Sequence, residues 1–125
     1  MKQTELIQKA EINRTYLKLC AERILALIDK GARSFEKPLD KEGNFFQLEI
    51  HQDYTTDDFY LLSIKDISIY YYNYNDKRVE REDDTNYLYK LLEEGLREKN
   101  KCDLQEYLDM MNRKDAKELY NYIND

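Results

Sequence analysis

Nucleophilic catalysis needs a reactive side chain beside a base that takes its proton. The sequence has one histidine, His51, and two cysteines, Cys20 and Cys102, and none of the three is close to another along the chain. The cysteine spacing matches neither a metal-ligand nor a redox motif, which predicts two reduced thiols in a cytosolic protein. The three glycines are isolated, so no glycine-rich phosphate-binding loop is predicted. We expect a non-enzymatic protein without cofactor, although a Cys–His pair formed in space stays an alternative to a half-buried strand histidine.

Carboxylates offer a second kind of chemistry, metal-dependent hydrolysis. Asp40 follows Pro38 and Leu39, and after a turn Glu49 precedes His51 on a predicted strand. This order is distantly similar to that of the PD-(D/E)xK nucleases, in which an Asp and a Glu bind Mg²⁺ and a Lys positions the attacking water. The resemblance implies a divergent nuclease with Asp40 and Glu49 as metal ligands. The sequence departs from the pattern, because Leu39 separates the Pro from the Asp and His51 replaces the Lys, so we expect no metal site.

The segment LIQKAEINRTYLKL, residues 6–19, resembles the two-helix core of a helix-turn-helix. The resemblance implies a DNA-binding transcriptional regulator in which Arg14, Thr15 and Lys18 face the DNA. Glu11 stands where the turn usually has glycine, and no predicted helix precedes the motif. A continuous helix through this segment is the competing prediction.

The composition describes an acidic protein that folds. The 125 residues carry a net charge of −6, 42% of them are hydrophobic, and twelve are tyrosine. This length predicts a single domain over residues 1–125 with one core. Residues 34–98 hold sixteen acidic and eight basic side chains, so the negative charge is concentrated there. We expect a cytoplasmic protein of a bacterial host cell, encoded by the bacterium or by one of its phages, with no membrane contact.

Residues 4–30 lack Gly and Pro and are rich in helix-forming residues, which predicts one long N-terminal helix. Gly31 is the predicted end, with Lys30 and Arg33 near the negative end of the helix dipole. The helix is predicted to lie across a sheet. Alternatively, a heptad seam with Asn13 as its polar member would pair two copies in a homodimer, so monomer and homodimer both stay open.

A period of two replaces the helical period over residues 34–82. Phe46, Leu48 and Ile50 alternate after a turn signal at residues 40–44, which predicts a hairpin. A polar break at residues 52–58 is expected to end this strand. The expected sheet has three or four antiparallel strands, the last a short charged edge strand at residues 77–82.

Two or three short helices are predicted after the sheet, which makes the fold class α+β. The first begins at Asp84 or Thr85. The second begins at Asp103, which with Glu106 resembles a capping box, and the last begins at about Asp115.

Tyrosines and carboxylates form the most unusual stretch, residues 67–84. Strand alternation separates an inward set from a tyrosine-bearing set on the opposite face. The negative charge around these tyrosines would repel phosphate, which disfavours direct nucleic-acid binding. Tyrosine is enriched in interfaces, and carboxylates complement a basic surface. The predicted partner-binding residues are Tyr70, Tyr72, Tyr74, Glu80, Glu82, Asp83 and Asp84.

The leading hypothesis is therefore a small acidic interaction protein. Its most concrete form is a phage-type inhibitor or nucleic-acid mimic that binds the basic surface of a nucleic-acid-handling protein, such as a nuclease or a CRISPR effector. Acidic phage-encoded inhibitors of this kind share its size, charge and predicted layout, which is an analogy of architecture. The competing interpretation is that the tyrosines pack beneath the C-terminal helices and the carboxylates only keep the protein in solution.

Overall fold

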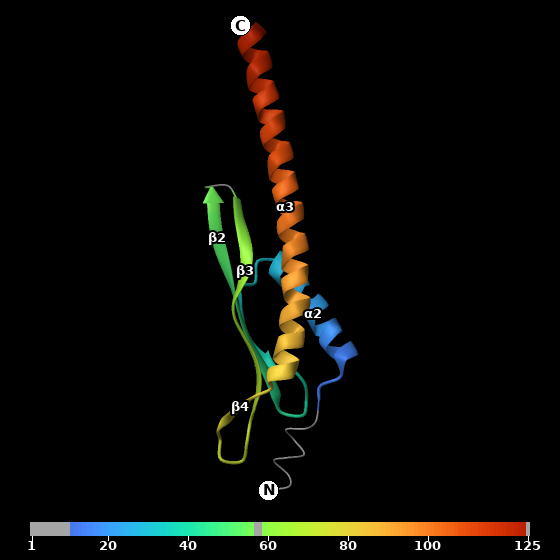
Figure 1. The fold of residues 1–125 in the computed structure, drawn as a ribbon. Helices are drawn as coiled ribbons and strands as arrows, with labels where there is room; N and C mark the ends of the chain where they lie inside the picture. The colour runs from blue at the N-terminus through green and yellow to red at the C-terminus, as the bar shows by residue number, and fades with distance from the viewer. Residues whose placement is uncertain (1–10, 57–58, 125) are drawn as a thin grey trace.

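The computed structural model describes residues 11–56 and 59–124 (Figure 1). Its four strands form one antiparallel sheet in the order β1-β2-β3-β4, so each strand pairs with its neighbour in sequence. The α+β class and the antiparallel sheet are confirmed. The elements are α2 (Arg14–Asp29), β1 (Ser34–Pro38), β2 (Asn44–Thr56), β3 (Phe59–Tyr72), β4 (Arg78–Glu80) and α3 (Glu82–Asn124).

Helix α2 begins later than predicted, because Asn13 caps it. The Asn13 side chain accepts hydrogen bonds from the backbone N–H groups of Thr15, at 2.8 Å, and Tyr16, at 3.2 Å. These groups have no partner inside the helix, which is why Asn is favoured at this position. Residues 4–10 of the predicted helix lie outside the described residues. Asn13 stands at the helix start, and Leu17 and Ile24 are buried in the core of this same chain, so they do not form the seam expected for a homodimer.

The end of α2 lies where the sequence predicts it. Gly31 has a φ of 107°, a backbone conformation that glycine adopts without strain. Arg33 donates to the carbonyl oxygen of Ile28 at 2.8 Å and to the side chain of Gln52 at 2.6 Å. The Arg33 guanidinium thus places a positive charge at the negative C-terminal end of α2 and links this end to β2.

Strands β2 and β3 form a hairpin longer than expected. β2 continues to Thr56, and β3 is continuous from Phe59 to Tyr72, so the predicted break at residues 52–58 is wrong over residues 52–56. Polar side chains beyond Ile50 do not end the strand, because its backbone still pairs with β3. The pairing shifts between Glu49 and Ile50, a β-bulge that bends the hairpin.

The predicted short helices are instead one helix, α3, of 43 residues. Asp103 does not begin a helix. Its carboxylate forms an ion pair with the ammonium group of Lys99, one turn earlier in the helix, at 3.2 Å. Lys99 also forms an ion pair with Asp29 of α2 at 3.1 Å. Burial by itself lowers the pKa of Lys99, but the hydrogen bonds to these two carboxylates and their negative charges together outweigh it, so the pKa is raised. Gly95 lies inside α3, and a Cβ there would come within 3.1 Å of the Leu25 Cγ, so glycine permits the close approach of α2.

Two α3 side chains fix the helix along β3. The backbone N–H of Ile69 donates to the Thr85 hydroxyl at 2.8 Å. The Asn100 amide accepts from the Leu62 N–H at 2.9 Å and donates to the Leu62 carbonyl at 2.8 Å. Fifteen helical residues rise about 22 Å, and seven strand residues extend about 23 Å. The two anchor points therefore match, and α3 runs antiparallel to β3 in register with it.

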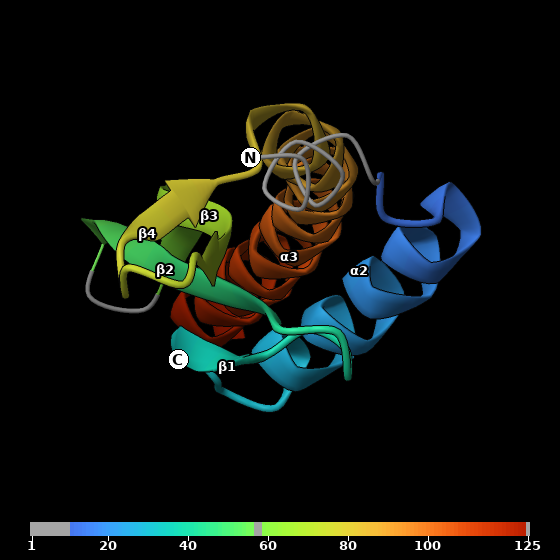
Figure 2. The same cartoon turned by 90° about the horizontal axis from the view of Figure 1, so that it is seen from below.

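Both helices contribute to a core on one face of the sheet. In Figure 2, α3 runs between the sheet and α2. Leu88, Leu92 and Leu96 of α3 are buried together with Leu48 of β2 and Ile69 of β3. No helix in the described part of the chain covers the opposite face of the sheet, which we call the open face. It carries Phe45, Gln47, Ser68, Tyr70, Tyr72 and Arg78 together with several carboxylates.

The Asn100 anchor makes a stability prediction. Asn100→Ala removes two hydrogen bonds to the Leu62 backbone, and we expect a loss of about 1–3 kcal/mol in the free energy of unfolding. Asn112→Ala, at an exposed position of the same helix, is the matched control and should stay within about 0.5 kcal/mol. Urea denaturation followed by circular dichroism measures both, and equal losses would contradict the anchoring role of Asn100.

Candidate functional site

The open face has an aromatic cluster at its centre. Phe45 stacks on Tyr70, with ring centroids 5.9 Å apart, and the Tyr72 ring stands edge-on to Tyr70 at 5.6 Å. The Arg78 guanidinium carbon lies 3.8 Å from the centroid of the Tyr70 ring. Offset and edge-on rings together with a cation over a ring are favourable arrangements. Alternation places this cluster opposite the core, because Phe46 and Ile69 are buried against the helices.

Polar side chains surround the aromatic cluster in a connected network. Arg78 donates to Glu80 at 2.9 Å and to Gln47 at 3.3 Å, and Gln47 donates to Asp66 at 2.9 Å. The Ser68 hydroxyl donates to the other oxygen of Glu80. These contacts cross β2, β3 and β4, so they hold the side chains of the open face in fixed positions. A rigid surface loses less conformational entropy when a partner binds.

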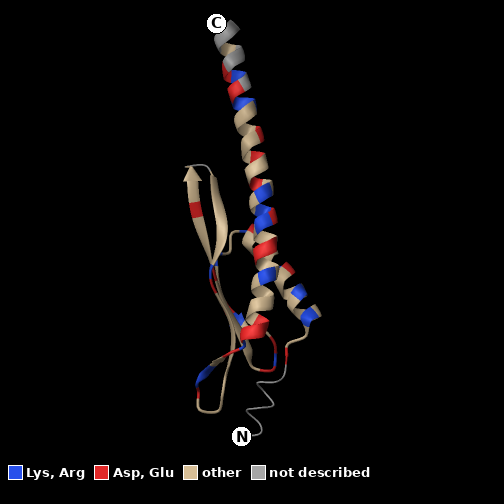
Figure 3. Cartoon of the chain, in the orientation of Figure 1, with Lys and Arg blue, Asp and Glu red and all other residues tan. Residues whose placement is uncertain are grey.

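Carboxylates outnumber cations on the open face. The cations are Lys65, which pairs with Glu49 at 3.7 Å, and Arg78. His51 contacts Asp53 at 2.7 Å on the same side. Figure 3 shows acidic and basic positions interleaved along α3, and beyond its acidic first turn residues 85–124 hold eight acidic and seven basic side chains. The carboxylates of the open face come from all four strands and are Glu36, Glu49, Asp53, Asp66 and Glu80.

The three predicted tyrosines differ in exposure. Tyr70 is only 3% exposed because Phe45, Tyr72 and Arg78 cover it, so it supports the open face from within. Tyr72 is 53% exposed beside it, and Tyr74, in the turn before β4, is 72% exposed. None of the three lies beneath α3. The pattern therefore leaves Tyr72 and Tyr74 accessible to a partner.

The four predicted carboxylates also lie in different settings. Glu80 belongs to the network of the open face. Glu82 and Asp83 are exposed in the first turn of α3, where a negative charge interacts favourably with the helix dipole. Asp84 is 3% exposed and accepts a hydrogen bond from Arg81 at 3.2 Å. Its carboxylate is buried against Arg81 and is therefore not part of an accessible charged surface.

Asp84 also holds the residues that precede α2. It accepts from the backbone N–H of Ile12 at 3.5 Å and lies 3.8 Å from the Arg14 guanidinium. Arg14 in turn stacks over the Tyr87 ring at 4.3 Å. Of the three residues expected to face DNA in a helix-turn-helix, Arg14 thus faces α3, whereas Thr15 and Lys18 are exposed. Residues 6–10 of that motif lie outside the described part, and residues 11–13 precede α2.

The two carboxylates of the nuclease-like pattern lie at opposite ends of β1. Asp40 accepts hydrogen bonds from the backbone N–H groups of Glu42, at 2.9 Å, and Asn44, at 3.2 Å, which shapes the turn before β2. Glu49 pairs with Ser34 at the far end of β1. Within residues 11–56 and 59–124, no group of three His, Cys, Asp or Glu side chains is arranged to hold a metal ion.

The histidine and the cysteines lie on different elements. His51 is on the open face, whereas Cys20 is on α2 and packs against the core on the other side of the sheet. Burial raises the pKa of the Cys20 thiol. The hydrogen bond with Tyr16 and the positive charge of Arg23 lower this pKa, but by less than burial raises it. Cys102 is exposed on α3, and both cysteines are free thiols. The structure therefore does not bring Cys20 and His51 together as an activated pair.

Several residues of the open face were not predicted. Phe45 and Gln47 could have been found from the sequence, because they alternate with the predicted inward residues of β2. Glu36 could have been found in the same way from the burial of Phe35 in β1. The position of Arg78 over Tyr70 depends on how β4 pairs with β3, which the sequence pattern does not specify.

Comparison with known proteins does not place this chain in a family: no protein-family model, curated protein or solved structure matches it. Among the described residues, no helix combines the length and the apolar character needed to cross a membrane.

The buried Asp84 makes the first prediction for this region. Asp84→Ala leaves the buried Arg81 without this partner, and breaking such a pair costs about 3–5 kcal/mol in the free energy of unfolding. Asp83→Ala removes an exposed charge of the same helical turn and should cost less than about 1 kcal/mol. Chemical denaturation of the two variants checks the difference, and similar losses would show that Asp84 is not a structural anchor.

The buried Tyr70 phenol predicts a pH dependence. Burial first, and then the nearby Tyr72 and Glu36, raise the pKa of Tyr70 above its ordinary value of 10.0. The folded protein then holds this proton more tightly than the unfolded chain, so the stabilisation is complete below pH 10.0 and is lost as the pH rises through the folded pKa. Tyr70→Phe should show a smaller loss of stability in this alkaline range, measured by urea denaturation at several pH values. The exposed control Tyr74→Phe should follow the wild type, and identical curves for all three proteins would refute the assignment.

Proposed function

We propose that this protein is a non-enzymatic interaction protein whose open face binds the basic surface of another protein. One observation carries the proposal: the helices cover a single face of the sheet, and the uncovered face combines an aromatic cluster with an excess of carboxylates. Aromatic side chains supply contact area, and complementary charge accelerates the encounter of the partners. The most concrete partner is a nucleic-acid-handling protein such as a nuclease or CRISPR effector, which the protein would inhibit.

The arrangement of charge supports contact with a broad basic surface. The five carboxylates of the open face are spread over four strands, so they form a two-dimensional patch. A nucleic-acid strand instead carries one phosphate about every 3.4 Å along a line. The mimicry in this proposal is therefore the occupation of a basic groove by an acidic patch, with Tyr72 as an accessible aromatic contact beside Phe45 and Tyr70.

Charge reversal on the open face tests the proposal. The double variant Glu36→Lys/Asp53→Lys changes two exposed carboxylates, and Glu94→Lys/Glu98→Lys makes the same change in net charge on α3. An exposed ion pair contributes about 0.2–1 kcal/mol, and reversal replaces attraction with repulsion. We expect the open-face variant to bind its partner roughly tenfold to a hundredfold more weakly at low salt, and the α3 variant to bind normally.

Affinity capture from a bacterial extract at low and high salt, followed by calorimetry on the captured partner, provides the measurement. Retention of basic nucleic-acid-binding proteins by the wild type and the α3 variant, but not by the open-face variant, is the expected result. Equal binding by both variants, or capture of acidic proteins only, would refute the proposal. Tyr72→Ala adds a second measurement, because it should weaken binding at both salt concentrations.

A further inference from the structure

The C-terminal part of α3 leaves the rest of the protein. Phe59 stacks on Tyr107, with ring centroids 5.1 Å apart, near the tip of the β2–β3 hairpin. Figure 1 shows α3 running on past this tip. Met110 and Met111 follow about one helical turn after Tyr107 and are 66% and 41% exposed. Most helical stability in proteins comes from packing of an apolar face, and the apolar side chains Met110 and Met111 are exposed here, so this part of α3 is suited to pairing.

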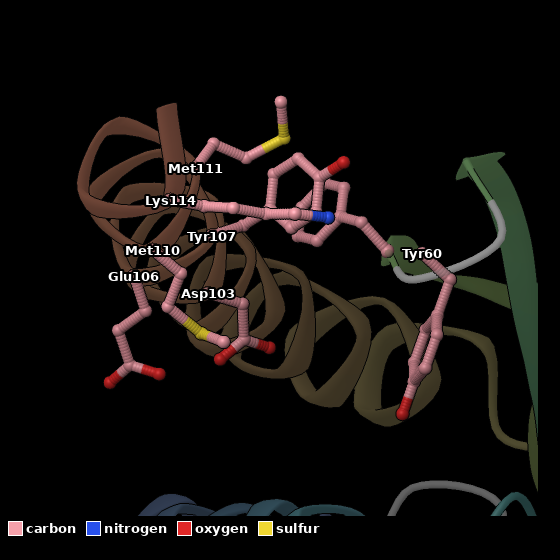
Figure 4. Close-up of a pocket in the computed structure, with 8 residues that line it drawn as sticks. Tyr60, Asp103, Glu106, Tyr107, Met110, Met111 and Lys114 are labelled. Carbon is pink, nitrogen blue, oxygen red and sulfur yellow. The ribbon is translucent and has the colours of Figure 1, made fainter. Parts of the chain in front are cut away.

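A groove lies where α3 separates from the hairpin. It has a volume of about 630 Å³, with Phe59 and Tyr60 of β3 on one side and α3 on the other. Figure 4 shows Asp103, Glu106 and Met110 on one side of α3, with Lys114 extending toward β3. Along α3 the groove lining therefore begins with the carboxylates of Asp103 and Glu106, continues with the apolar side chains of Tyr107 and Met110, and ends with the cation of Lys114.

The spacing of these residues is that of a helix-pairing seam. Positions 103, 107, 110 and 114 are separated by four, three and four residues, which keeps them on one face of a helix paired with another. Along this face the order is carboxylate, aromatic, methionine and ammonium. A second helix with the same sequence in the opposite direction presents the reverse order, so the two sets are complementary.

We propose that this groove binds the same groove of a second copy of the chain, with the two α3 helices antiparallel across a two-fold axis. Lys114 of each copy then lies opposite Asp103 and Glu106 of the other, and Met110 packs on Tyr107 of the other. Asp103 already contacts Lys99, but a carboxylate has further acceptor positions. The interface is isologous, because each copy contributes the same patch, and it leaves the open face free.

Charge exchange tests the contact directly. Analytical ultracentrifugation of the full chain over a range of concentrations should show a monomer–dimer equilibrium that weakens with salt. Glu106→Lys alone and Lys114→Glu alone should each weaken dimerisation about tenfold or more, whereas the double variant Glu106→Lys/Lys114→Glu should recover most of it. Asp109→Lys and Lys101→Glu, at exposed positions outside the groove lining, are matched controls and should dimerise normally.

The exposed Cys102 gives an independent measure of direction. With Cys20→Ser in the background, a spin label on Cys102 is the only label in each copy. Pairing of residue 103 with residue 114 places the two labels thirteen residues apart, which is about 20 Å along the helix axis. Parallel pairing in register would place their backbones about 8–10 Å apart. Pulsed electron paramagnetic resonance separates the two arrangements.

Three outcomes would overturn the proposal. The first is a chain that stays monomeric at every concentration while circular dichroism shows an intact fold. The second is a dimer whose affinity does not change with Glu106→Lys and Lys114→Glu. The third is a dimer that Leu108→Asp abolishes but Met110→Asp does not, since Leu108 is an exposed residue outside the groove lining and its loss would place the contact elsewhere on α3.

Discussion

The contact between α3 and β3 determines most of the structure. Thr85 and Asn100 bond to the β3 backbone at two points whose spacing on the helix equals their spacing on the strand. Between these points, Leu88, Leu92 and Leu96 enter the core, and Gly95 admits α2 to the other side of the helix. Because both helices are held on one face, the other face of the sheet stays open. The same alignment carries α3 beyond the hairpin tip, which creates the groove. Both proposed binding surfaces therefore follow from one helix–strand contact.

The two surfaces have different chemistry and are suited to different partners. The open face is acidic over all four strands, so complementarity requires a surface of opposite charge. The groove carries both signs of charge at its two ends and is complementary to itself. A protein with both surfaces presents two open faces when it pairs, and two linked sites bind a partner with two matching surfaces more tightly than one site does. The proposed dimerisation and the proposed inhibition would in this way use separate parts of the chain.

The sequence predicted the strands and the helix end better than it predicted exposure. Alternation identified the inward residues of the hairpin, because side chains of a strand alternate whatever surrounds it, and Gly31 marked the end of α2. The run Glu82, Asp83, Asp84 was interpreted as one charged surface, but Asp84 turns inward to Arg81. Arg81 and Asp84 are only three residues apart, but the burial of this ion pair depends on Ile12 and Arg14, which reach Asp84 from a distant part of the chain. Local sequence does not specify that contact. The same limit applies to the predicted helix start at Asp103, since a capping-box pattern also fits the interior of a helix with an i,i+4 ion pair.

The bonds from Asn100 to Leu62 have a consequence for the solution behaviour of the protein. β4 pairs with β3 only at residues 70–72, so among the described residues the outer edge of β3 near Leu62 has no neighbouring strand. An uncovered strand edge is a template for pairing with another chain, and this is how many sheet proteins aggregate. Asn100 occupies the N–H and the carbonyl of Leu62, and α3 lies along the edge on either side. The helix thus covers this strand edge, and separation of α3 from β3 would expose the edge to pairing with another chain.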